Sequence, residues 1–224
     1  MINSNLPLLI TPELFSINNF NVNVYNSSWG DFLVIEDFWT YPDKIHEAAL
    51  KIPTVKLQGV YNVDANGTEY YDGRSHFIFY EKQLFMDVIE DIIIKCFNLA
   101  IDIDPNQKLF PLSNNIFTMS EESYSKYGQC YYGPHEDGSK TIASITYLNR
   151  EYDEEDGTVM FNGSGFHKSP QAWVEKSDVS KIGFLPAKYN RLIIYDGSVH
   201  HASSITSKWI NNIRHTMVYF THTL

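Results

Sequence analysis

The chain has little of what secreted, membrane-spanning and nucleic-acid-binding proteins depend on. Its 224 residues include only two cysteines, Cys96 and Cys130, which make no disulfide framework, so we expect a reducing, cytoplasmic location. No apolar run approaches the ~18 residues that a membrane-spanning helix needs, and we expect no signal peptide because the first residues carry no basic start. With 17 basic against 27 acidic residues the net charge is −10, which argues against binding to nucleic-acid backbones or anionic membranes.

Several common catalytic motifs are also missing. The sequence has no His-Glu-x-x-His zinc motif, no glycine-rich phosphate loop and no serine nucleophile elbow. It has no repeats, low-complexity tracts or linkers either, so one domain over residues 1–224 is the simplest interpretation.

Aromatic residues are abundant instead, at 15% of the chain with 15 tyrosines and 14 phenylalanines, and these residue types favour strands. Apolar spacing predicts helices over 43–51 and 81–99. Alternation predicts a half-buried strand over 20–25, and a short apolar run predicts another over 32–35. Further strands are expected at 115–120, 128–135, 141–147, 157–161, 181–184, 191–195, 199–204 and 213–221.

This distribution predicts a mainly β fold with its helices first. Residues 1–110 would form a helix-containing N-terminal support region, and residues 111–224 an antiparallel double sheet, as in a sandwich, jelly roll or barrel. The longest loop-like stretch is 163–181.

Two metal-binding residue types, His135 and Asp137, lie at the centre of segment 127–149. In an extended backbone, residues i and i+2 point to the same face, so both can meet one cation while Glu136 points away. A second histidine from a distant strand would complete two histidines and one carboxylate, the ligand set of non-haem iron(II) oxygenases. Alone, this pair is also what a surface turn would contain.

A distant histidine is available where an apolar strand over 191–195 leads into His200 and His201. Thirteen residues further on is Arg214, which shares a strand face with Thr216. A guanidinium that faces inward needs an anion, because an unpaired buried charge is very costly, and its planar fork suits a carboxylate. The alternative for Arg214 is a structural ion pair.

In combination, these segments resemble the prolyl-hydroxylase-like branch of the 2-oxoglutarate/Fe(II)-dependent dioxygenases. The match covers residues 124–221, and it consists of Pro134 to Asp137, Tyr147-Leu148-Asn149, Asp156-Gly157-Thr158, Asn190 to Gly197, His201 and Arg214, in that order. The resemblance implies a double-stranded β-helix (a jelly roll) with flanking N-terminal α-helices.

The resemblance also implies an iron site. His135, Asp137 and a distal histidine would be the metal ligands. In the family this histidine lies eleven residues after the asparagine of the pattern, which selects His201 over His200.

A cosubstrate site is implied by the same comparison. Arg214 matches the basic residue that pairs with the distal carboxylate of 2-oxoglutarate. Tyr147, Thr216 and Tyr127 match hydroxyl-bearing residues of that site. Arg74, in a stretch similar to a poorly characterised subgroup, is expected to contact substrate; the alternative is an arginine in an exposed loop.

The implied activity is hydroxylation of a substrate with O2 and 2-oxoglutarate, with release of succinate and CO2. Halogenating relatives replace the carboxylate ligand by a small residue, so Asp137 favours hydroxylation. The substrate class stays open between a small molecule and a peptide or protein side chain; no nucleic-acid or membrane partner is expected.

Two alternatives remain at this point. The same fold also serves as a non-enzymatic binding or structural module without metal. Enzymes of the same family also demethylate, epoxidise or cyclise. Binding of one Fe(II) per chain and turnover of 2-oxoglutarate would separate the first alternative from the enzyme.

Overall fold

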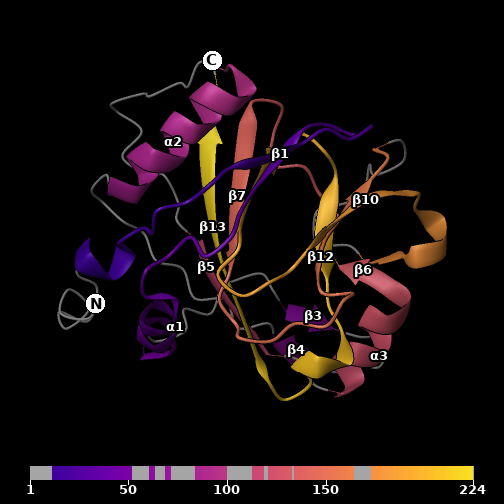
Figure 1. The fold of residues 1–224 in the computed structure, drawn as a ribbon. Helices are drawn as coiled ribbons and strands as arrows, with labels where there is room; N and C mark the ends of the chain where they lie inside the picture. The colour runs from indigo at the N-terminus through magenta and orange to yellow at the C-terminus, as the bar shows by residue number, and fades with distance from the viewer. Residues whose placement is uncertain are drawn as a thin grey trace.

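The computed structural model describes residues 12–51, 61–63, 69–71, 84–99, 113–118, 121–132, 134–163 and 173–223. Within these residues the protein is mainly β, with antiparallel sheets and few helices (Figure 1). None of the described helices is long and apolar enough to cross a membrane.

The larger sheet has six antiparallel strands in the order β1-β2-β11-β7-β13-β5. In that order, the strands are Asn23–Tyr25, Phe32–Ile35, Leu192–Asp196, Thr141–Tyr147, Ile213–His222 and Ser113–Thr118. The central strand β7 is buried along its whole length, as expected for a strand that is covered on both faces.

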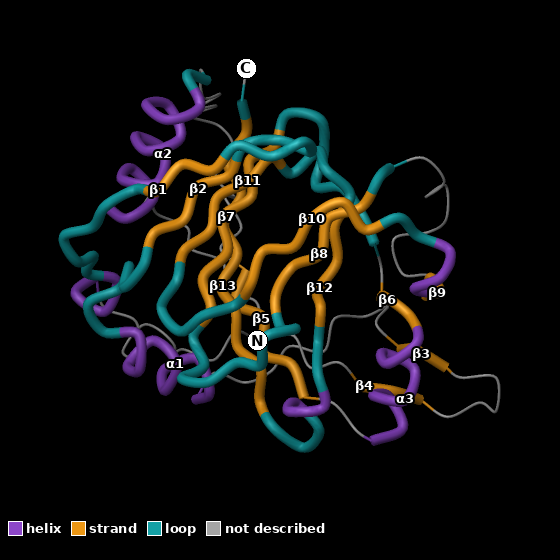
Figure 2. Tube along the Cα trace, turned by 45° about the vertical axis from the view of Figure 1, so that its right-hand side comes forward, coloured by secondary structure: helices purple, strands orange, loops and turns teal. Residues whose placement is uncertain are grey.

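A three-stranded antiparallel sheet lies beside it in the order β10-β8-β12, made of Lys181–Pro186, Gly157–Phe161 and His201–Ser204 (Figure 2). Two short ribbons complete the strands. One pairs β3 (Tyr61–Val63) with β4 (Glu69–Tyr71), and the other pairs β6 (Cys130–Tyr132) with β9 (Trp173–Glu175).

The helices are α1 (Pro42–Lys51), α2 (Leu84–Phe97) and α3 (Glu121–Gln129), with short 3-10 turns η2 (Pro12–Phe15), η3 (Lys176–Asp178) and η4 (Ser207–Trp209). Residues of α1 and α2 form one apolar cluster with the outer face of the larger sheet, which contributes Ile142 and Met217 among others. Both helices lie on the side of this sheet away from the smaller sheet (Figure 2).

The opposite face of the larger sheet points toward the smaller sheet. Because side chains alternate along a strand, Ala143, Ile145 and Tyr147 of β7 share this inner face with Ile193 and Tyr195 of β11. They pack with Met160 of β8 and Leu185 of β10. We call the region between the inner faces of the two sheets the inner space. The candidate site lies in this region.

Most predicted elements are present, with shifted ends, but two predictions are wrong. Residues 128–135 are not one strand, because α3 runs to Gln129 and β6 covers only Cys130–Tyr132. The half-buried strand over 20–25 reduces to β1, whose three residues are all exposed because it is an edge strand. The loop-like stretch 163–181 contains β9 and η3.

The division into a support region over 1–110 and a core over 111–224 stays a prediction. The structure adds that β1 and β2, from the first part of the chain, belong to the same sheet as β11 and β7.

Candidate metal centre

An isolated antiparallel bridge brings His135 and His201 together from distant parts of the chain. The two residues exchange both backbone hydrogen bonds, at 3.0 and 2.8 Å. Directly opposed residues in an antiparallel pair place their side chains on the same side, and the two imidazole rings are 4.7 Å apart between centroids.

Asp137 joins the two histidines from the following turn. Its Oδ1 lies 3.5 Å from Nε2 of His135, and its Oδ2 lies 3.4 Å from Nε2 of His201. One ligand atom from each of the three residues lies within 4.8 Å of the others, and among the described residues this is the one such group of histidine, cysteine or acidic side chains.

The surroundings orient His201 for metal binding. Its Nδ1 lies 2.8 Å from the carbonyl oxygen of Val199, which accepts a hydrogen bond from Nδ1–H. Nε2 is then unprotonated, and its lone pair is on the side of Asp137. Burial lowers the pKa of His201, and the negative charge of Asp137 opposes this only in part. The neutral imidazole is the form that binds metals.

Asp137 lacks a hydrogen bond that its burial would demand. Its side chain is 9% exposed, and within the described part of the chain no donor reaches its Oδ2. A buried acceptor without a donor is costly, and a divalent cation would satisfy it. The donor set of two imidazoles and one carboxylate fits iron(II) with open positions.

The neighbouring histidine points elsewhere, as alternation predicts. His200 lies 4.0 Å from Oε2 of Glu136 and packs beside Gly163. Glu136 and His200 therefore share the side opposite to Asp137 and His201.

Gly197 fits closely beneath Asp137. Its N–H donates to the carbonyl of Thr141 at 2.7 Å, and its own carbonyl accepts from the N–H of Asp137 at 2.7 Å. A Cβ at this position would lie 2.8 Å from the Thr141 oxygen, 3.0 Å from Cβ of Asp137 and 3.2 Å from its Oδ2.

We expect the substitution Gly197→Ala to displace the Asp137 carboxylate and lower iron(II) affinity by about 10- to 100-fold, the range for outer-shell changes. An anaerobic metal titration measures this. Gly128→Ala is the matched control, because nothing lies within 4 Å of a Cβ there. Equal metal affinity in Gly197→Ala and the wild type would contradict the close fit.

A second unsatisfied group, Arg214, lies on the inner face of β13. This face also carries Thr216 and Val218. Arg214 is 4% exposed, and among the described residues its Nε and Nη2 have no hydrogen-bond acceptor. A buried guanidinium without an anion is strongly unfavourable, so this site is suited to an anionic ligand.

Hydroxyl groups surround Arg214. Thr216 is buried and faces Tyr147 across the β13–β7 ladder. The hydroxyl of Tyr147 is 3.0 Å from Oγ1 of Thr158 in β8. Burial raises the pKa of Tyr147, and both its hydrogen bond with Thr158 and the positive charge of Arg214 oppose the rise.

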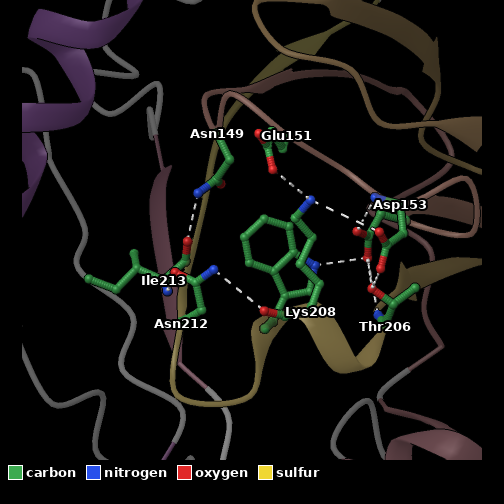
Figure 3. Close-up of polar contacts among 9 residues, drawn as sticks. Asn149, Glu151, Asp153, Thr206, Lys208, Asn212 and Ile213 are labelled. Carbon is green, nitrogen blue, oxygen red and sulfur yellow. Dashed lines mark hydrogen bonds and ion pairs between the residues drawn. The ribbon is translucent and has the colours of Figure 1, made fainter.

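Asn149 fixes the backbone on both sides of Arg214. Its Nδ2 donates to the carbonyl of Ile213 at 2.6 Å (Figure 3). Its Oδ1 accepts from the N–H of His215 at 2.7 Å. His215 itself points to the outer face, where its Nδ1 is 2.8 Å from Nδ1 of His46 in α1.

The loop after Asn149 is tied to the η4 segment by polar contacts (Figure 3). Lys208 bridges Glu151 at 3.4 Å and Asp153 at 4.0 Å. Asp156, which is fully buried, accepts hydrogen bonds from the indole of Trp209 at 2.8 Å and the N–H of Thr206 at 3.1 Å.

These polar contacts hold the aromatic side chains of Tyr147, Tyr152 and Trp209 together near Arg214. The ring of Tyr152 packs against Tyr147 at 5.6 Å and against Trp209 at 5.4 Å. Tyr152 also lines a cleft of about 570 Å³ together with Arg150, Lys208 and others.

Truncating the buried carboxylate should destabilise the fold. We expect Asp156→Ala to lower the free energy of unfolding by about 3 kcal/mol, because the Trp209 and Thr206 donors lose their acceptor. Glu154→Ala, at an exposed position of the same loop, makes the same charge change and should shift stability by less than about 0.5 kcal/mol. Equal denaturation midpoints for both variants would contradict a structural role for Asp156.

Most residues that the sequence nominated come together in the inner space. His135, Asp137 and His201 form one group, and Arg214, Thr216 and Tyr147 form another. Tyr127 lies in α3, but its side chain is outside the described residues, as is the whole of Arg74.

Sequence reasoning gave no site role to Gly197, Asn149 and Tyr195, although all three lie within the segments that carry the family resemblance. Tyr195 packs edge-on against the ring of His201, with 5.2 Å between centroids and 79° between planes. Its alternation with Ile193 in an apolar strand was the available signal.

Comparisons with known proteins give fold similarity only. No family model matches the chain, and no curated protein matches it. Among solved structures, a prolyl-4-hydroxylase of Pseudomonas putida has 14% identity and a TM-score of 0.40, covering 73% of this chain and 77% of that one. The non-heme alpha-ketoglutarate-dependent epimerase SnoN from nogalamycin biosynthesis has 11% identity and a TM-score of 0.47, covering 85% and 78%.

A third structure is an oxidoreductase of the 2OG-Fe(II) oxygenase family from Burkholderia pseudomallei. It has 13% identity and a TM-score of 0.44, covering 85% of this chain and 84% of that one.

Proposed function

We propose that this protein is an Fe(II)- and 2-oxoglutarate-dependent dioxygenase that hydroxylates its substrate. One observation carries the proposal: two unsatisfied groups of opposite charge, the enclosed Oδ2 of Asp137 and the buried guanidinium of Arg214, belong to the region between the two sheets. Asp137 is joined by two imidazoles, and Arg214 has no anion among the described residues. A cation at one end and an anion at the other would satisfy both.

The arrangement of the strands supports a jelly roll with the site inside it. Two antiparallel sheets enclose the inner face, and α1 and α2 cover the outer face of the larger one. Such a double sheet keeps a small ligand away from water while its strand ends supply polar groups.

His135, Asp137 and His201 would hold the iron. Asp137 offsets part of the metal charge, and the hydrogen bond from Nδ1 of His201 to Val199 fixes the ring orientation. When bound there, iron and 2-oxoglutarate would supply the oxidising chemistry, which is oxidation of the substrate by O2 coupled to conversion of 2-oxoglutarate to succinate and CO2.

Arg214 would bind the carboxylate of 2-oxoglutarate that is remote from the metal. Its guanidinium can make two parallel hydrogen bonds to a carboxylate, and Thr216 with Tyr147 provides hydroxyl groups beside it. Tyr127 and Arg74 stay as proposals for cosubstrate and substrate contacts, respectively.

The substrate is proposed to be a small molecule or a peptide or protein side chain. A library of both kinds, incubated with the iron-loaded protein and 2-oxoglutarate, tests this by mass spectrometry. A hydroxylase gives succinate together with a product that has gained one oxygen atom. Succinate with a product that has gained no oxygen would indicate another oxidation, and no succinate with any candidate would speak against the proposed reaction.

A further inference from the structure

Tyr195 occupies a distinctive place on the inner face. It lies in β11 opposite Ala143 of β7. Its side chain is 3% exposed, and its ring stands edge-on to the ring of His201. The residue therefore lines the space next to the proposed metal ligands.

The hydroxyl of Tyr195 makes no hydrogen bond with the described residues, and its oxygen is not among their fully enclosed unsatisfied atoms, so a ligand can reach it. The other two buried tyrosines in the described part of the chain have their hydroxyls engaged: Tyr147 pairs with Thr158 at 3.0 Å, and Tyr219 donates to Glu90 at 2.9 Å. Tyr195 therefore has a hydrogen bond left to donate beside the metal group.

The contact with His201 places Tyr195 at the metal end of the inner face, with 5.2 Å between the two ring centroids. A phenol hydroxyl is protonated at neutral pH, so it can donate a hydrogen bond to an anionic ligand at that end.

We propose that the Tyr195 hydroxyl donates a hydrogen bond to the metal-facing, 2-oxo acid end of the bound cosubstrate, while Arg214 holds the opposite end. The inference rests on the proposed function. It assigns a binding role to a residue outside the ligand and carboxylate-binding sets, and it predicts that the two ends of the cosubstrate are recognised independently.

Tyr195→Phe tests the inference, since it removes the hydroxyl and keeps the ring. In anaerobic titrations we expect iron(II) affinity to stay unchanged and the dissociation constant of 2-oxoglutarate to rise about 10- to 100-fold, as for a hydrogen bond to a charged acceptor. The absorption band of the complex between iron(II) and the 2-oxo acid should also shift. Tyr219→Phe, on the outer face of the larger sheet, is the matched control and should change neither quantity.

Pyruvate separates the two ends because it has the 2-oxo acid but no distal carboxylate. Tyr195→Phe should lower the affinity for pyruvate by the same factor as the affinity for 2-oxoglutarate, whereas Arg214→Ala should leave the affinity for pyruvate unchanged. If Tyr195→Phe lowers the affinity for 2-oxoglutarate but not for pyruvate, the assignment of Tyr195 to the metal end is overturned.

The inference and the proposed function fail in different ways. Wild-type affinity and band position in Tyr195→Phe, with a large loss in Arg214→Ala, would reject the role of Tyr195 and leave the dioxygenase intact. If the wild type develops no absorption band with iron(II) and 2-oxoglutarate, both the role of Tyr195 and the proposed dioxygenase function are rejected.

Discussion

Replacing Arg214 by alanine should raise the dissociation constant of 2-oxoglutarate by roughly one and a half to four decades. Breaking a buried, hydrogen-bonded charge pair loses about 2–5 kcal/mol. The expectation follows from the position of Arg214, which is 4% exposed with two nitrogens unsatisfied among the described residues. Iron binding should survive, because Arg214 is not in the metal group. The measurement is a titration of 2-oxoglutarate into the anaerobic iron complex.

Two further variants define the role of the guanidinium. Arg214→Lys should recover only part of the affinity, because an ammonium cannot make the two-pronged contact. Arg150→Ala removes the same charge from a side chain that is 71% exposed and should leave the dissociation constant unchanged. An unchanged constant in Arg214→Ala would assign the carboxylate to another basic residue.

His201→Ala should abolish iron binding and turnover, whereas its neighbour His200→Ala should only weaken turnover. Nε2 of His201 lies 3.4 Å from Asp137 on the inner side, while His200 faces Glu136 on the other. Loss of a direct ligand should lower iron affinity by more than the roughly 100-fold upper range of outer-shell changes.

Iron content after anaerobic loading and desalting measures the difference, and His135→Ala and Asp137→Ala should match His201→Ala. The two adjacent histidines are controls for each other, since both changes remove one imidazole from the same segment. If His200→Ala loses iron and His201→Ala retains it, the metal ligand is His200 and the assignment of His201 is wrong.

The sequence predicted those helices and strands that are marked by a pattern within their own residues. Pro42 starts α1 and an apolar stripe marks α2, so both helices could be found. The helix α3 was missed because Glu121–Gln129 is polar and has no such stripe. The exposure of β1 depends on its position at the sheet edge, which no local pattern reveals.

The candidate site divides in the same way. Alternation along a strand sends adjacent side chains to opposite sides, and the structure has this arrangement both at His200 and His201 and at Arg214 and His215. The close fit of Gly197 under Asp137 joins residues 60 positions apart in the chain, and the place of Tyr195 on the inner face depends on its pairing with Ala143, 52 positions away, so only the fold shows them. The ligand and cosubstrate roles themselves stay predictions.

The most direct test of the account is an anaerobic titration of the purified protein, first with iron(II) and then with 2-oxoglutarate, followed by visible absorption. The account predicts one iron per chain, a metal-to-ligand band that appears only when both are present, and succinate once O2 is admitted. The band should be absent in Asp137→Ala and should require far more 2-oxoglutarate in Arg214→Ala. A wild-type protein that binds no iron, or that binds iron without developing the band, would contradict the proposed function.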